Sequence, residues 1–249
     1  MNIFNDADLE KANFILNSQY SKISELTSPE LRELAVVWCF YSGKIEGNTY
    51  TYVETEALLK DGITSEKRYE DAKMLKNLHN TFVAELEYIN KAGNKELISE
   101  ATLFRVHRSI IDSLVSDEEA GLLRSRAVRI SGTDYVPPRN PTEIQAKLNE
   151  ILFCQENISN PLERAVYLHC NLAKLQPFID GNKRTARLIE AVILMNADII
   201  PIYSTKDADI ITYRKALIDY YEKGDYRGYI NYFLNHQIER INFLSEEKL

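Results

Sequence analysis

Residues 176–187 carry the residue types from which a phosphate-binding loop is built. They read Gln-Pro-Phe-Ile-Asp-Gly-Asn-Lys-Arg-Thr-Ala-Arg. Gly181 and Asn182 tolerate left-handed backbone angles, and a segment with helical periodicity follows them, from about residue 182 to 196. A turn that opens onto a helix N-terminus directs several backbone N–H groups at one point, and the helix dipole favours an anion there. The sequence therefore predicts an anion-binding nest at this helix start.

The charged residues of this segment point to a polyphosphate ligand. Lys183, Arg184 and Arg187 lie in the first helical turns, where cations oppose the helix dipole unless a polyanion is bound. Asp180 precedes them, and Mg²⁺ prefers one or two carboxylates together with phosphate oxygens. We therefore expect a nucleotide or similar polyphosphate with Mg²⁺ on Asp180.

The elements that must position this loop are predicted to be helices. A capping box at Thr27–Glu30, with proline in the first turn, opens one helix, and Ser99, Pro141 and Asn160 open three more. Apolar residues at helical spacing extend these helices into an all-α bundle. The other helices are expected at about 52–60, 65–92, 182–196, 207–223 and 225–245. One exception is the alternating run around Ser131-Gly132, which predicts a short β-hairpin.

The loop resembles the Fic motif, H-P-F-x-[DE]-G-N-[GK]-R-x-x-R, at every defined position except the first, where Gln176 replaces the histidine. The resemblance implies a protein adenylyltransferase that transfers AMP from ATP to a hydroxyl side chain of a target protein. It assigns the general-base position to Gln176 and the Mg²⁺ to Asp180. Phosphate contacts fall to Gly181, Asn182, Lys183, Arg184 and Arg187, with the γ-phosphate on Arg187, and Tyr213 and Tyr221 lie where the family forms its adenine pocket.

A second segment resembles the Fic inhibitory motif, [ST]-x-x-x-E-[GN]. Ser42 and Glu46 are four residues apart and share a helix face, and Gly47 suits the position after a helix end. The chain thus resembles the class with an N-terminal inhibitory helix, here about 29–47, and the resemblance predicts an ion pair between Glu46 and Arg187.

The predicted hairpin resembles the Fic flap over the active site, at about 127–138. In the family this flap holds the target segment by main-chain pairing, which assigns target docking to Val128, Ile130, Thr133 and Tyr135. We divide the chain into an N-terminal helical segment (1–34), a Fic domain (35–235) and a C-terminal helical tail (236–249).

The missing histidine leaves the activity open. An amide does not take up a proton near neutral pH, and loss of a general base costs about 10²–10⁴-fold in rate. Gln176, whether natural or engineered, therefore predicts an impaired adenylyltransferase or a non-catalytic nucleotide-binding pseudoenzyme. Lys183 also occurs in the death-on-curing (Doc) toxins, so a Doc-like protein kinase is a third alternative.

Composition and net charge argue against several other classes of protein. A net charge of −7 argues against nucleic-acid binding, and three scattered cysteines are typical of reduced core residues in a cytoplasmic protein. We expect no signal peptide and no membrane span. The target, modified on Ser, Thr or Tyr, is not identified, and a homodimer stays open. The four histidines lack metal-ligand spacing and are interpreted as structural: His79, His107, His169 and His236.

Overall fold

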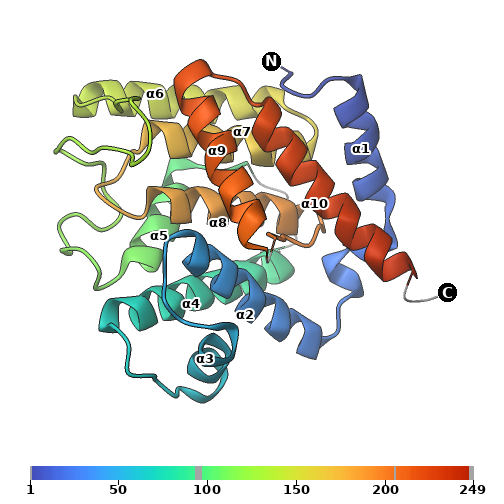
Figure 1. The fold of residues 1–249 in the computed structure, drawn as a ribbon. Coiled ribbons are helices and arrows are strands. Elements are labelled where there is room, and N and C mark those ends of the chain that lie inside the picture. The colour runs from blue at the N-terminus through green and yellow to red at the C-terminus, as the bar shows by residue number, and fades with distance from the viewer. Residues whose placement is uncertain (1, 93–96, 205, 247–249) are drawn as a thin grey trace.

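The computed structural model describes residues 2–92, 97–204 and 206–246, and it is a bundle of helices (Figure 1). The α-helices and shorter turns, in chain order, are α1 (Asp6–Asn17), η1 (Gln19–Ser21), η2 (Ile23–Glu25), α2 (Ser28–Ile45), α3 (Tyr52–Glu56), η3 (Ala57–Asp61), α4 (Tyr69–Ala92), α5 (Glu100–Ile111), α6 (Pro141–Cys154), η4 (Gln155–Asn157), α7 (Pro161–Leu175), α8 (Asn182–Asn196), α9 (Asp207–Lys223) and α10 (Arg227–Glu246). The predicted all-α class is confirmed. Part of the predicted C-terminal tail, residues 247–249, lies outside the described residues.

The helices begin where local capping predicts. Thr27 and Glu30 form the expected reciprocal capping box at the start of α2, and Ser99 accepts a hydrogen bond from the Thr102 amide at the start of α5. Asn140 and Asn160 cap α6 and α7, each with proline in the first turn. These contacts satisfy amides that the helix itself leaves unpaired, so the boundaries follow from neighbouring residues alone.

Helix α8 forms the centre of the bundle. Every residue from Arg184 to Met195 is buried, because α7 packs along α8 and α4 and α5 also contact it. Figure 1 shows α8 across the middle of the molecule, with α2 and α4 below it and α9 and α10 in front. A helix enclosed in this way has no solvated face, so its arginines must find partners inside the protein.

The N-terminal segment docks against the last helix. The Asp8 carboxylate on α1 pairs with the Arg227 guanidinium on α10 at 2.8 Å, and Glu163 accepts hydrogen bonds from the backbone amides of Ile3 and Phe4. Helices α1 and α10 therefore lie side by side at one edge of the bundle (Figure 1). Among the described helices none is long and apolar enough to cross a bilayer.

The predicted hairpin at residues 127–138 is wrong. This flap segment turns at Ser131 and Gly132, but residues 127–138 form no strand pairing with one another. The Arg124 guanidinium instead donates to the carbonyls of Gln176, Arg126 and Pro138. Proline has no N–H for a strand ladder, and a buried cation that binds three carbonyls fixes the segment without cross-strand hydrogen bonds.

Candidate nucleotide-binding site

The loop before α8 is held in a sharp turn by its own side chains. Gln176 ends α7 with a left-handed backbone (φ 50°), and Gly181 repeats that conformation (φ 72°) just before α8. Across this turn, the Asn182 side chain accepts a hydrogen bond from the Phe178 amide and donates one to the Phe178 carbonyl, both at 2.8 Å. Asn182 therefore shapes the loop with both of its polar atoms.

The start of α8 has the properties of an anion nest. No side chain in the described part of the protein caps its first-turn amides, although such amides normally have a capping partner. They open beside a cavity of about 220 Å³ that Glu46, Gln176, Asp180, Gly181 and Lys183 help to line. An uncapped amide cluster with a lysine at its rim attracts a negatively charged group.

Asp180 lines this nest, and the buried Arg184 pairs with it. The exposed Asp180 carboxylate contacts Arg184 Nη2 at 3.0 Å and accepts from the Gly181 amide at 2.6 Å. Arg184 is itself 4% exposed, and its Nη1 is buried with no partner among the described residues. A buried guanidinium nitrogen without an acceptor is costly, so this arginine retains capacity to bind a further anion.

The ion pair predicted between Glu46 and Arg187 is present. Arg187 is fully buried on α8, and its Nη2 lies 2.7 Å from Glu46 Oε1 at the end of α2. Ser42 adds two acceptors, its hydroxyl at 3.0 Å from Nε and its carbonyl at 3.2 Å from Nη2. Gly47 follows with φ 85°, the left-handed conformation expected after the helix end.

The charges around Glu46 set its protonation. Burial by itself raises the pKa of this carboxyl group, but Arg187, followed by Lys183, outweighs burial and lowers the pKa to about 2. Burial also opposes the charge of Arg187, while Tyr213 and Glu46 raise the pKa of its guanidinium. Both groups are therefore charged at neutral pH, and the Glu46 carboxylate lines the nest cavity.

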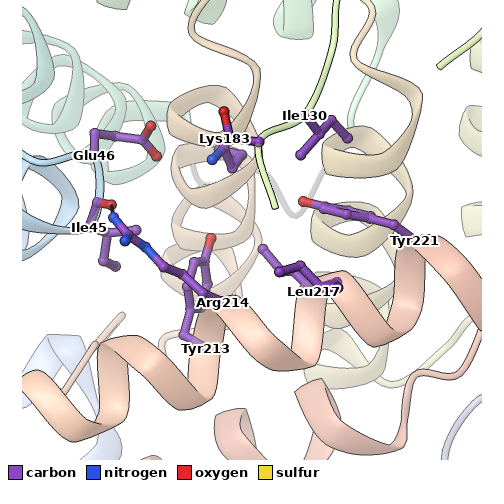
Figure 2. A pocket seen from close by; sticks show the side chains of 10 residues that line it. Ile45, Glu46, Ile130, Lys183, Tyr213, Arg214, Leu217 and Tyr221 are labelled. Atoms are coloured by element: carbon purple, nitrogen blue, oxygen red, sulfur yellow. Dashed lines mark hydrogen bonds between the residues drawn. The ribbon is translucent and has the colours of Figure 1, made fainter. Parts of the chain in front are cut away.

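A second cavity, of about 270 Å³, adjoins the nest (Figure 2). Its wall combines apolar groups from α9 and the flap segment with charged groups from α2 and α8. Figure 2 shows the Tyr221 ring and Leu217 facing Ile130 across the opening, with Glu46 at the other end and Lys183 between Glu46 and Ile130. The Tyr221 hydroxyl is buried and has no partner in the described chain. Lys183 and Glu46 line both cavities, so one ligand can place an apolar ring in the second cavity and anionic groups in the nest.

Tyr213 lies deeper than its predicted ligand contact implies. It is 1% exposed, and its hydroxyl accepts a hydrogen bond from Arg187 Nη1 at 3.2 Å. Its ring contributes to the wall of the second cavity. Tyr213 therefore connects the second cavity to Arg187.

The flap segment places its four predicted docking residues in two groups. Val128 and Ile130 line the nest cavity, whereas Thr133 and Tyr135 face α9. Thr133 donates to Glu222 at 2.8 Å, and the Tyr135 ring stacks on the Tyr221 ring of α9 with 6.2 Å between the ring centres. Lys174 of α7 lies 5.1 Å from the centre of the Tyr135 ring. The segment is thus attached to the same helix that lines the second cavity.

Sequence reasoning missed three residues that support the site. His107 stacks on Phe178 at 3.7 Å, accepts from the Gly121 amide at 2.9 Å and lies 3.0 Å from the Asp180 carbonyl. Desolvation, and secondarily the charge of Arg184, lowers its pKa to about 4, so the ring is neutral and can donate to that carbonyl. Arg124 holds Gln176, and Arg214 donates to the Ile45 carbonyl at 2.5 Å. No motif or spacing identifies these residues, because their contacts with Asp180, Gln176 and Ile45 span dozens of positions or more.

The Gln176 side chain hydrogen-bonds to the main chain of α7 and does not serve as a general base. Gln176 Nε2 donates to the Ala173 carbonyl at 2.6 Å, and the residue is 7% exposed. Its left-handed backbone is uncommon for a residue other than glycine, although asparagine, aspartate and histidine adopt it several times more often than most. The position therefore accommodates histidine without a change in the main chain.

The structure thus brings together a central buried helix, uncapped amides at its start and a carboxylate from the end of α2 paired to its arginine. Residues 97–194 match the Fic/DOC family, so the chain contains a Fic/DOC family domain. It is similar to "Protein adenylyltransferase Fic" of Nematostella vectensis, with 30% identity over 77% of this chain and 42% of the relative. The chain thus spans less than half the length of that relative.

Solved structures show the same fold. A fragment of Fic-1 from C. elegans superposes with a TM-score of 0.76 and 23% identity, over 98% of this chain and 74% of the fragment. A Fic-domain-containing signalling protein from Bacteroides thetaiotaomicron superposes with a TM-score of 0.72 and 21% identity, over 97% of this chain and 94% of that protein. These neighbours are Fic proteins, and the shared fold covers nearly the whole chain.

Proposed function

We propose that this chain is a Fic-type protein adenylyltransferase that binds ATP at the start of α8 and transfers AMP to a hydroxyl side chain of a target protein. The uncapped amides of α8 carry this proposal, because they lie beside Arg184 and Lys183 and open into a cavity. The relatives named as adenylyltransferases support the same transferred group.

In this proposal the ligand spans both cavities. The adenine ring occupies the second cavity against Tyr221 and Leu217, and the phosphates lie on the first-turn amides of α8. The γ-phosphate reaches Arg187 once Glu46 has left it, since both anions compete for the same guanidinium. Glu46 is therefore an autoinhibitory residue, and Ser42 and Gly47 fix the helix end that presents it.

The donor set at the nest fits Mg²⁺. Asp180 offers one solvent-exposed carboxylate beside the amides, and Mg²⁺ commonly takes one protein carboxylate together with phosphate and water oxygens. Asp180 would hold the ion after Arg184 turns to the phosphates. The ion supplies charge neutralisation of the phosphates, and the protein residues position the nucleotide.

The turnover of this chain is expected to be slow. Gln176 does not accept a proton, and its amide donates to Ala173, so the target hydroxyl meets no base at this position. The flap segment presents Val128 and Ile130 to the cavity, where a target segment would dock. The α8 amides still bind the phosphates and position the nucleotide when the general base is missing. This chain is therefore expected to bind nucleotide better than it turns it over.

The test is transfer of label from ATP by four proteins: the wild type, Glu46→Gly, Gln176→His and the double variant. With Mg²⁺ and ATP labelled at the α-phosphate, the double variant is expected to label itself or a protein of a lysate at least about 100-fold faster than the wild type. Glu46→Gly with Gln145→His, a matched exchange on α6, controls for the added imidazole.

Three results would reject the proposal. Absence of label from α-labelled ATP with the double variant would exclude adenylyl transfer. Label that arrives only from γ-labelled ATP would instead indicate a phosphotransferase, as Lys183 leaves open. ATP binding that is tight but unchanged by Gln176→His, without transfer, would indicate a non-catalytic nucleotide-binding module.

A further inference from the structure

A second buried carboxylate lies behind the nest on the same helix as Arg187. Glu190 is 1% exposed, three residues after Arg187. Its Oε1 accepts from the Tyr203 hydroxyl and its Oε2 from the Tyr229 hydroxyl, each at 2.7 Å. Its Oε2 also lies 3.0 Å from Nδ1 of the fully buried His169. A carboxylate enclosed this completely is rare unless it is paired, and no lysine or arginine among the described residues contacts Glu190 directly.

A continuous hydrogen-bonded chain connects Glu190 to Arg187. His169 Nε2 lies 3.1 Å from the Tyr213 hydroxyl, which accepts from Arg187 Nη1 at 3.2 Å. The guanidinium can only donate and an ionised carboxylate can only accept. On the other side of the imidazole, His169 Nδ1 lies 3.0 Å from the Tyr229 hydroxyl, which donates to Glu190 Oε2. The chain is therefore continuous when Arg187 donates to Tyr213, Tyr213 donates to His169 Nε2, His169 Nδ1–H donates to Tyr229, and Tyr229 donates to Glu190.

Two carboxylates therefore balance the charge of Arg187, and they differ in how exposed they are. Glu46 contacts it directly from α2, at the rim of a cavity and 19% exposed. Glu190 lies on the same helix as Arg187 and accepts hydrogen bonds from two buried tyrosine hydroxyls, with His169 Nδ1 at 3.0 Å. A buried cation that loses its only counter-charge is strongly destabilised, so displacement of Glu46 without a second carboxylate would force Arg187 out of position.

We infer that Glu190 is the second counter-charge of Arg187 and that, through His169 and Tyr213, it holds the guanidinium in place when Glu46 leaves. Glu190 is a positioning residue, since it touches neither the cavities nor any ligand in them. The inference rests on the proposed release of Glu46 and adds what keeps the phosphate-binding arginine ordered in the released state.

A double-mutant cycle without nucleotide tests this inference. The wild type, Glu46→Gln, Glu190→Gln and the double variant are unfolded in urea at pH 7. Because either carboxylate can balance Arg187, the double variant is expected to lower the folding equilibrium constant about tenfold more than the product of the two single effects. If Glu190 has a purely structural role, the effects of the two single substitutions on the folding equilibrium constant should simply multiply.

The control replaces Glu190→Gln by Glu163→Gln, which changes a buried carboxylate that caps the backbone of Ile3 and Phe4. The effects of Glu163→Gln and Glu46→Gln on the folding equilibrium constant are expected to multiply, to within about twofold. Should Glu190→Gln not fold, Tyr213→Phe breaks the chain at its middle and is expected to show the same excess with Glu46→Gln. Effects of Glu190 and Tyr213 that multiply like the control would overturn the inference.

Addition of ATP with Mg²⁺ separates this inference from the proposed function. The terminal phosphate supplies a new counter-charge to Arg187, so saturating ATP is expected to reduce the tenfold excess. If no variant binds ATP while the excess persists, the proposed function fails and the role of Glu190 stands. If ATP binds but the cycle shows no excess, the role of Glu190 fails alone.

Discussion

The pH dependence of stability should report the ion pair between Glu46 and Arg187. The two side chains meet at 2.7 Å, with Arg187 fully buried and Glu46 19% exposed. Arg187 and Lys183 overcome the opposing effect of burial and lower the pKa of Glu46 from its ordinary 4.5 to about 2. The folded protein therefore holds this carboxyl group in its ionised form far into the acid range.

The sign and size follow from proton linkage. A group with a lowered pKa in the folded state contributes its stability above the ordinary pKa and loses it as the pH falls toward the folded-state pKa. At about 1.4 kcal/mol per pH unit, the gap between pKa 4.5 and about 2 corresponds to roughly 3 kcal/mol of unfolding free energy. That contribution is complete above pH 5 and disappears between about pH 4.5 and pH 2.

Glu46→Gln isolates this contribution, because glutamine has the shape of the protonated carboxyl group. Urea unfolding of both proteins from pH 7 to pH 2 should show a stability difference of roughly 3 kcal/mol at pH 7 that shrinks toward zero near pH 2. Glu56→Gln removes the surface pair with Lys60 and should change stability by less than about 1 kcal/mol at any pH. A wild type and Glu46→Gln that differ by the same amount at every pH would refute the assignment of the lowered pKa to this pair.

Three further outcomes test how the loop and the flap segment are held. Gly181→Ala should cost about 1–2 kcal/mol in urea unfolding and weaken ATP binding, because φ is +72° and the new Cβ would lie 3.1 Å from an isoleucine methyl group; unchanged ATP affinity would argue against the nest. His107→Leu should cost about 1–3 kcal/mol by leaving a buried amide unpaired, and a melting temperature equal to that of the wild type would contradict this. Lys174→Met should speed thermolysin cleavage within the flap segment, since the ammonium group lies 5.1 Å from the centre of the Tyr135 ring; an unchanged cleavage rate would show that this contact does not restrain the segment.

Local sequence determined the helices and the chemistry of the loop. Capping residues such as Thr27 and Ser99 act within three positions of themselves, so their helix starts could be read directly. The left-handed turn at Gly181 and the helix end at Gly47 also follow from the residue type. The resemblance between motifs supplied the pairing of Glu46 with Arg187, which spacing alone does not predict across 141 positions.

The hairpin shows where local pattern failed. Alternating residues around Ser131-Gly132 favour a two-stranded ribbon, but an isolated pair of strands is marginal in water. Arg124 lies outside the alternating run and binds carbonyls on both sides of it. Its contacts with Gln176 and Pro138 come from a guanidinium that the pattern does not include, so the pattern predicted the wrong structure.

The sequence by itself therefore determined which segments are helical, where the anion-binding turn lies and which cations surround it, because those properties depend on residues within a few positions of one another. Only the tertiary structure decided that His107 supports Asp180, that Tyr213 lies behind Arg187 and that Glu190 is linked to the same arginine. These contacts join helices far apart in the chain, and they exist because packing around the buried α8 removes water and leaves each charged group only the partners that neighbouring helices provide.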